Sequence, residues 1–434
     1  MSTGKNREEA LDEKWFLQLC ELSPQVQRKF KVGNYQNARA DFLSSKAVEP
    51  SFELPYLKTG DDNLKLEKLI HLSESIEKCP DTNPVVKKLY QEKIVEKQRQ
   101  FKLINFYKQK PSKIDNDELT SMVESVYGRP SQSVFNHLIS VLRDSLNHVT
   151  NELKNSPEFE RLNEVLTTDS ESEVKDFVPI ESKDFGEIVY TDAREVRHYI
   201  LKRLPVLGLA DWRVQISCDS VGGFKVWPRT KRIIVPTSKM LVARKGDRVL
   251  TATRLEAMIA HEVMTHAVRA ENGFNSGLKL LAVGLASYWR GEEGVAGYRE
   301  QQIVGATDYM NKNMHFTIGL AYGLDRQGVK RSFREVFDIL IDYFLVIGGL
   351  DNNSAINKAF TACERIFYGA TGSGTAFVMT KDIAYREGNI AVYRLLEKNP
   401  AAEEWFDVGK FDPTNQGHVS ALQTLGLINV SHGK

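Results

Sequence analysis

The sequence predicts an α+β protein that is mainly helical and contains one small antiparallel sheet. Apolar side chains recur at helical spacing through most of residues 63–152, with charged residues between them. Strand-like runs are confined to residues 212–235, directly before a further helical pattern. The hydrophobic fraction of 41% and the charged fraction of 26% are typical of a soluble globular protein.

Composition divides the chain into three parts. Residues 1–152 are expected to form a helical N-terminal region, in which two amphipathic helices between residues 63 and 110 pack on each other. Residues 153–186 are rich in Glu, Ser and Asp, which favours a linker or an exposed crossover. Residues 187–434 hold every candidate site residue and are expected to form the catalytic domain.

Three short runs predict the sheet. Residues 212–217 alternate between apolar and polar side chains, residues 224–227 follow a Gly-Gly turn, and residues 233–235 are apolar. Together they are typical of a small antiparallel sheet that precedes a helix.

That helix is expected over residues 254–270. Thr253 and Glu256 have the spacing of a capping box. Apolar residues continue at helical spacing from Leu255 to Val268, and Asn272-Gly273 supplies a C-terminal stop.

His261 and His266 lie on this helix, and Glu262 follows the first of them. Neutral imidazole nitrogens are good zinc ligands, and a neighbouring carboxylate can take a proton from a metal-bound water. Five residues of an ideal α-helix turn the chain by about 500°, so the two rings would point about 140° apart. A single π-type turn would bring them together. The spacing therefore predicts a locally widened helix, or no metal site at all.

A third ligand is expected, because catalytic zinc usually has three protein ligands and one open position. The best candidate segment is residues 291–298, whose small residues allow a close approach of two helices. A carboxylate from this segment would complete a set of two His and one Glu.

The motifs as a set resemble a known family, the bacterial QEGLA-motif proteins and the related eukaryotic microtubule-associated tyrosine carboxypeptidases. Glu292 stands where the family motif has Gln, and Met264 stands where Gly is common. The resemblance rests on four blocks in this order: His261-Glu262-Val263-Met264-Thr265-His266, Asn272-Gly273, the apolar run 280–288, and Glu292-Glu293-Gly294-Val295-Ala296.

The resemblance implies that His261, His266 and Glu293 bind Zn²⁺ and that Glu262 is the catalytic base. It also implies a metallopeptidase core of the gluzincin type. The expected activity is that of a zinc metallocarboxypeptidase, a hydrolase that removes a C-terminal residue such as Tyr or Glu from a peptide or protein tail. The spacing between His266 and Glu293 leaves open whether tubulin itself is a substrate.

Residues 365–369 and 380–388 resemble two further family blocks. A carboxypeptidase needs a cation for the terminal carboxylate of its substrate and a donor for the tetrahedral oxyanion. Arg365, Lys381 and Tyr385 are the candidates, and purely structural hydrogen bonds are the alternative for each. The Gly-rich run 369–375 lacks the Lys of a Walker loop and is expected to be a flexible loop near the active site.

Charge and cysteine content exclude other classes. Lys and Arg number 58 against 57 Asp and Glu, which argues against nucleic-acid binding driven by bulk charge. The four cysteines lack the spacing of a zinc finger or a disulfide framework. The longest apolar stretches, 278–289 and 336–350, are shorter than the about 20 residues of a membrane span, and no signal peptide is visible. We therefore expect a cytoplasmic protein without membrane partners; its oligomeric state is not predicted.

Other hypotheses stay open at this stage. One alternative is a non-catalytic regulatory or binding protein on a peptidase fold. Such a protein need not keep Glu262 beside an intact ligand set, which argues against this alternative. Alternatively the chain is a zinc endopeptidase or aminopeptidase. The predicted sheet has two possible roles: its edge strand could pair with the substrate backbone, or the sheet could serve only to support the helix.

Overall fold

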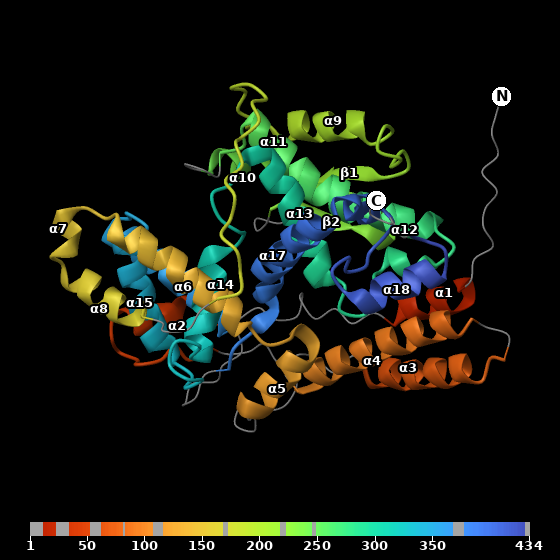
Figure 1. Ribbon diagram of the computed structural model, residues 1–434, viewed down its shortest axis with the longest axis horizontal. Coiled ribbons are helices and arrows are strands. Elements are labelled where there is room, and N and C mark those ends of the chain that lie inside the picture. The colour runs from red at the N-terminus through yellow and green to blue at the C-terminus, as the bar shows by residue number, and fades with distance from the viewer. Residues whose placement is uncertain are drawn as a thin grey trace.

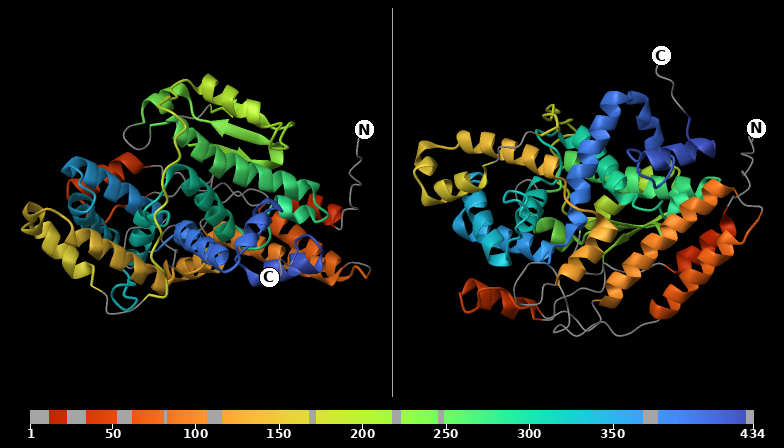
Figure 2. Two further views of the ribbon diagram at one scale, coloured as in Figure 1. Left: turned by 45° about the horizontal axis from the view of Figure 1, so that its top comes forward. Right: turned by 60° about the horizontal axis from the view of Figure 1, so that its bottom comes forward.

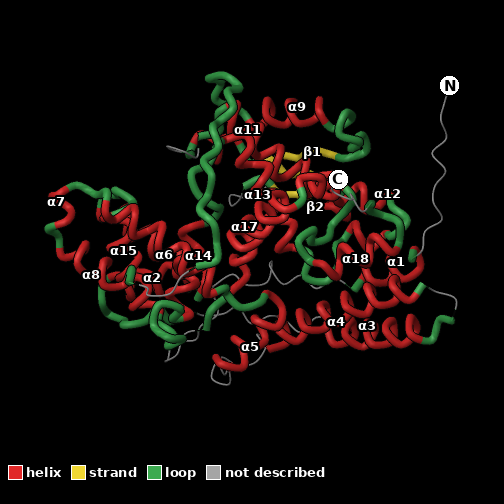
Figure 3. Tube along the Cα trace, in the orientation of Figure 1, coloured by secondary structure: helices red, strands yellow, loops and turns green. Residues whose placement is uncertain are grey.

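The computed structural model consists mostly of helices and contains one three-stranded sheet (Figures 1 and 3). It describes residues 12–22, 34–52, 62–80, 83–106, 116–167, 172–217, 223–244, 249–367 and 377–429. No helix in these ranges is long and apolar enough to cross a membrane. The predicted mainly helical α+β class is confirmed.

Every described element before residue 166 is a helix, and these helices pack in two groups. Helices α1, α3 and α4 pack against residues 278–285. Helices α2, α6 and α8 pack against the helices between residues 316 and 366 (Figure 1). Both hydrophobic clusters join residues on either side of the predicted boundaries at 152 and 187, so that division stays a prediction. The bounds are α1 (Glu13–Glu21), α2 (Tyr35–Leu43), α3 (Asp62–Glu77), α4 (Pro84–Phe106), α5 (Asn116–Tyr127), α6 (Gln132–Asn147), α7 (Asn151–Lys154) and α8 (Pro157–Val165).

The sheet is mixed, with strand order β1-β3-β2. β2 (Lys225–Trp227) pairs antiparallel with β3 (Arg232–Val235), whereas β1 (Arg213–Ile216) pairs parallel with β3. The prediction of an antiparallel sheet is therefore wrong for β1. Only β2 and β3 are joined by a tight turn, which forces them antiparallel. β1 takes the other edge of β3 in the register that buries Val214 beside Ile233 in a shared core.

One continuous helix runs past the sheet in three segments: α11 (Ala252–Met258), the π-helix η5 (Ile259–Ala267) and α12 (Val268–Asn275). Its N-cap is Thr251, whose hydroxyl accepts a hydrogen bond from Arg254 N at 3.1 Å. The predicted capping box at Thr253 is wrong, because the Glu256 carboxylate turns away to Tyr199 on α9 (Ala193–Arg203).

The predicted stop at Asn272-Gly273 is also wrong, since the helix continues to Asn275. A Cβ on Gly273 would lie 2.3 Å from the backbone nitrogen of Ala282, in the 3₁₀ turn η6 (Lys279–Ala282). Gly273 is thus required for close packing of two segments rather than for ending a helix.

Helix α13 (Trp289–Val304) lies between the π-helix and α17 (Ile383–Lys398) (Figure 2). A Cβ on Gly294 would lie 2.4 Å from the carbonyl oxygen of Gly388, so the α13 and α17 backbones are in direct contact. This contact positions the helix that carries Glu293. The remaining elements are η3 (Pro228–Thr230), α10 (Ser238–Val242), α14 (Lys312–Tyr322), α15 (Phe333–Val346), α16 (Asn352–Ile366), η7 (Thr380–Asp382), η8 (Pro400–Asp407) and α18 (Gln416–Thr424).

Candidate metal centre

The widened turn expected from the histidine spacing is present as the π-helix Ile259–Ala267. It places the rings of His261 and His266 on the same side of the helix, with their centroids 5.3 Å apart. The buried Thr265 hydroxyl donates to the carbonyl of Ala260, five residues back, at 2.9 Å. This bond gives the carbonyl a partner in the widened turn, where regular α-helical pairing is lost.

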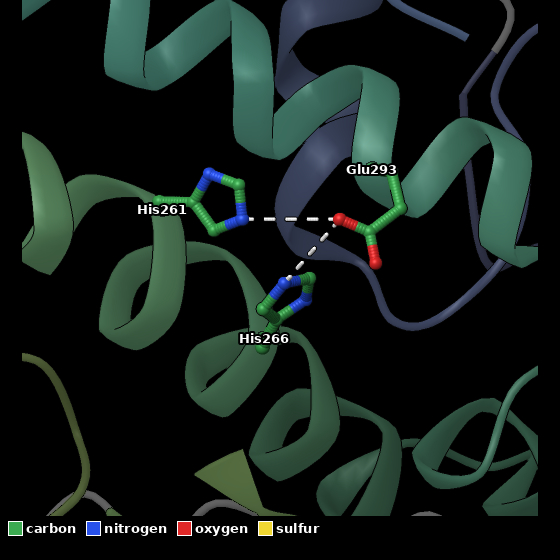
Figure 4. Close-up of side chains that lie close together, drawn as sticks. All are labelled: His261, His266 and Glu293. Carbon is green, nitrogen blue, oxygen red and sulfur yellow. Dashed lines mark ion pairs between the residues drawn. The ribbon is translucent and has the colours of Figure 1, made fainter. Parts of the chain in front are cut away.

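Glu293 approaches both imidazoles from α13 (Figure 4). Its Oε2 atom lies 3.8 Å from His261 Nε2 and 3.9 Å from His266 Nε2. All three candidate ligand atoms lie within 4.8 Å of one another. Ligands at about 2.0–2.1 Å from a tetrahedral zinc are separated by roughly 3.3 Å, so a small contraction of this set would enclose an ion.

The Oε2 atom of Glu293 is buried and has no hydrogen-bond partner among the described residues. A buried carboxylate oxygen without a partner is costly unless a cation or a donor completes its environment. The two Nε2 atoms face the same point (Figure 4). The arrangement therefore fits a metal ion bound by two imidazoles and one carboxylate.

Two further carboxylates orient the imidazole rings. Glu300 accepts from His261 Nδ1 at 2.9 Å, and Glu292 accepts from His266 Nδ1 at 2.9 Å. With the proton held on Nδ1, each Nε2 can offer its lone pair to a metal ion at the point that Glu293 also faces. The sequence analysis missed both roles. Their signal was the position of Glu300 two helical turns after Glu293, and the adjacent acid Glu292 in the Glu-Glu pair.

Four carboxylates gather at this centre, and two of them, Glu292 and Glu300, are paired with Lys or Arg. Glu292 is paired with buried cations, and Glu300 lies 3.5 Å from Arg254. Glu262 and Glu293 have no Lys or Arg within ion-pair distance in the described part of the chain. Burial alone would lower the pKa of His261, but the Glu300 hydrogen bond and the nearby carboxylates raise that pKa to about 9. A cation bound at this point would offset the charge of the two carboxylates that have no Lys or Arg partner among the described residues.

Glu262 lies beside the ligand set without belonging to it. Burial raises the pKa of its carboxyl group, whereas His266 and His261 act in the opposite direction. It makes no hydrogen bond or ion pair in the described structure. A carboxylate held close to the centre but not committed to a partner is suited to accept a proton.

The structure distinguishes among the three predicted substrate-binding residues. Arg365, on α16, forms a bidentate ion pair with Asp382, in which its Nη2 atom lies 2.8 Å from Oδ1. Lys381, in η7, lies over the ring of Trp289, with Nζ 5.6 Å from the centroid. No described residue accepts a hydrogen bond from Lys381 or pairs with the Tyr385 hydroxyl.

Lys381 and Tyr385 are electrostatically coupled to the centre. Burial lowers the pKa of Lys381, and the charges of Asp382 and Glu293 oppose that shift. Burial raises the pKa of Tyr385, and Glu293 raises it further. The phenol therefore keeps its proton and can donate it in a hydrogen bond. The Gly-rich run 369–375 lies outside the described residues.

Residues 232–432 match the family model of microtubule-associated tyrosine carboxypeptidase. The matched segment of this family begins at β3 and contains the π-helix, α13 and η7, whereas α1–α8 precede it. Searches of curated proteins and of solved structures found no match. The match confirms the resemblance to the tyrosine carboxypeptidases predicted from the motifs; the roles of individual residues stay predictions.

Proposed function

We propose that the protein is a zinc-dependent carboxypeptidase that removes a C-terminal residue from a peptide or protein tail. The observation that carries the proposal is the convergence of His261, His266 and Glu293 on one point. The family description supports the carboxypeptidase class. It also makes a tail ending in Tyr, such as that of tubulin, the first substrate to test, with a Glu-terminated tail as the second.

In this proposal His261, His266 and Glu293 hold the zinc, and one coordination position stays open for the reaction. When bound, zinc supplies Lewis acidity at the scissile carbonyl and at the attacking water. Glu262 takes the proton of the attacking water and then delivers it to the leaving amine. Because burial raises the pKa of Glu262, its carboxylate is a stronger base than an exposed one.

Recognition of the substrate carboxylate is assigned to Lys381 in preference to Arg365. Asp382 already neutralises Arg365, whereas the Lys381 ammonium has a ring face and no acceptor among the described residues. A terminal carboxylate would supply that acceptor. Tyr385 is assigned to the oxyanion, because its protonated hydroxyl has no other described partner.

Two measurements test the proposal. Metal analysis is expected to find about one zinc per chain in the wild type and little in His261→Ala. Equal zinc in both proteins would contradict the ligand assignment. Peptides that differ in their last residues would then be incubated with the protein and followed by mass spectrometry. Loss of single residues from the carboxyl end is expected, and loss confined to the amino end would contradict carboxypeptidase activity.

A further inference from the structure

A buried lysine from the C-terminal part of the chain reaches the metal centre. Lys410 is 4% exposed, and its ammonium group donates to Glu292 Oε1. The same Oε1 atom accepts from His266 Nδ1 at 2.9 Å. The second carboxylate oxygen, Oε2, lies 2.8 Å from Nη1 of the fully buried Arg269. A chain of contacts therefore connects Lys410, through Glu292, to the candidate zinc ligand His266.

Hydrogen bonds to the backbone around Lys410 hold this segment in an orientation that directs the Lys410 side chain into the protein. Lys410 N donates to Leu281 O at 2.8 Å, and Leu285 N donates to Lys410 O at 3.0 Å. Arg269 donates to the carbonyls on either side of it, to Gly409 at 2.8 Å and to Phe411 at 2.7 Å. Lys410 is thus held by residues 281 and 285 and by Arg269, which lies on the same continuous helix as His266.

Packing alone does not account for this arrangement. Three ionised groups, Lys410, Arg269 and Glu292, are removed from water together, and apolar side chains of the same volume would usually stabilise a core as well or better. Apolar residues, however, cannot accept the hydrogen bond from His266 Nδ1–H. The charged cluster therefore serves the histidine rather than the core.

We infer that Lys410 is a positioning residue of the metal centre, acting through Glu292 on His266. Its ammonium holds the Glu292 carboxylate in the place where that carboxylate accepts the hydrogen bond from Nδ1–H, which leaves Nε2 free to bind the metal. The inference rests on the proposed function, because it assumes that His266 binds zinc. It assigns to Glu292 and Lys410 a joint role: each needs the other, and neither binds the metal.

The test is a double-mutant cycle read by zinc affinity, measured by competition with a chromophoric chelator. Lys410→Met is expected to weaken zinc binding about 10- to 100-fold, the range found for residues that orient metal ligands. Glu292→Gln alone is expected to weaken it as well, because Lys410 is left buried without its anion. In the double variant, Gln still accepts from His266 and the Lys410 charge is gone, while Arg269 loses its anion but keeps the carbonyls of Gly409 and Phe411 as acceptors. Zinc affinity should therefore recover relative to Glu292→Gln and exceed the value that additive losses from the two single variants would give.

Lys93→Met is the matched control. Lys93 is buried like Lys410 and forms an ion pair with Glu96 at 2.5 Å, but it contacts neither histidine. Its loss is expected to lower thermal stability and to leave zinc affinity unchanged. A second readout is the visible spectrum of the cobalt-substituted protein, which reports ligand geometry. It should change in Lys410→Met and return in the double variant.

The outcomes separate the inference from the proposed function. A wild-type protein without zinc would contradict the proposed function itself. A wild-type protein that binds zinc as tightly as Lys410→Met and Glu292→Gln would overturn the inference alone. Additive losses in the double variant would also overturn it, as would a loss of zinc affinity in Lys93→Met equal to that in Lys410→Met. If Lys410→Met alone does not fold, the inference is tested by comparing Glu292→Gln with the double variant. A zinc affinity that is higher in the double variant than in Glu292→Gln supports the inference, and an equal or lower affinity overturns it.

Discussion

Four glutamates surround the two histidines, and their surroundings give them different roles. Glu292 and Glu300 accept from imidazole Nδ1 atoms, Glu293 faces both Nε2 atoms, and Glu262 has no described partner. Burial and neighbouring charges, rather than residue type, thus distinguish the proposed ligand, the proposed base and the two orienting groups. The acid at position 292, where the family motif has Gln, is the one neutralised by Lys410.

At the residue scale, Glu262→Gln tests the proposed base. Gln has the same shape but accepts no proton, so turnover should fall on the order of 10²–10⁴-fold while one zinc stays bound. Peptide hydrolysis per bound zinc, followed by mass spectrometry, checks this. Met264→Gln, an exposed position on the same helix, is the control and should keep its activity. A Glu262→Gln protein with full turnover would rule out Glu262 as the base.

Lys381→Met tests recognition of the substrate carboxylate. Met keeps the packing over Trp289 but removes the charge, and a hydrogen bond to a charged group contributes about 1.5–3 kcal/mol. The KM for C-terminal tail peptides should therefore rise about 10- to 100-fold, with a smaller change in kcat. Lys358→Met, which removes a lysine lying over the ring of Phe344, is the matched control. An unchanged KM in Lys381→Met would show that Lys381 does not bind the substrate carboxylate.

At the scale of elements, the centre depends on the π-helix and on α13, whose glycines allow close packing. The π-helix brings two histidines five residues apart onto one side, and α13 delivers Glu293 because its glycines allow direct contact with α17. The histidine spacing predicted either a widened turn or no metal site, since an ideal α-helix would separate the rings, and the structure has the widened turn. The identity of the partner helix of α13 was not predictable, because glycines show that something packs closely but not what.

Gly294→Ala tests the contact between α13 and α17. The added Cβ would lie 2.4 Å from Gly388 O, so one helix must move. We expect a loss of about 1–3 kcal/mol in the free energy of unfolding and weaker zinc binding, because Glu293 moves with α13. Chemical denaturation and chelator competition measure the two effects. Gly223→Ala, where no atom lies within 4 Å of the new Cβ, should change the free energy of unfolding by less than about 0.5 kcal/mol.

At the scale of the whole molecule, charge is unevenly distributed although the net charge is +1. Residues 193–244, which form α9, the sheet and α10, contain 11 Lys and Arg against 3 Asp and Glu. The sheet packs against the π-helix through β2, so this basic region adjoins the metal centre. Its exposed cations are Arg194, Arg197, Lys202, Arg213, Lys225, Arg229 and Lys239.

The basic region predicts a salt effect that depends on the substrate. Exposed charges are screened within about 8 Å at 0.15 M ionic strength, so binding of an acidic tail should weaken as salt is raised. The KM of an acidic tail peptide is expected to rise several-fold between low and physiological salt. A neutral tail with the same last residue should show little change. Equal salt dependence for both peptides would exclude a role for the basic region in binding the tail.

By itself, the sequence determined the helical class, the widened helix and the set of candidate ligands. The first two follow from local spacing, namely the apolar period and the five-residue step from His261 to His266, whereas the choice of Glu293 as third ligand came from the resemblance to a known family. Only the tertiary structure decided that β1 is parallel to β3, that Asp382 neutralises Arg365, and that Lys410 reaches His266 through Glu292. These features depend on which distant groups meet when apolar surfaces are buried, and the local pattern of a chain does not contain that information.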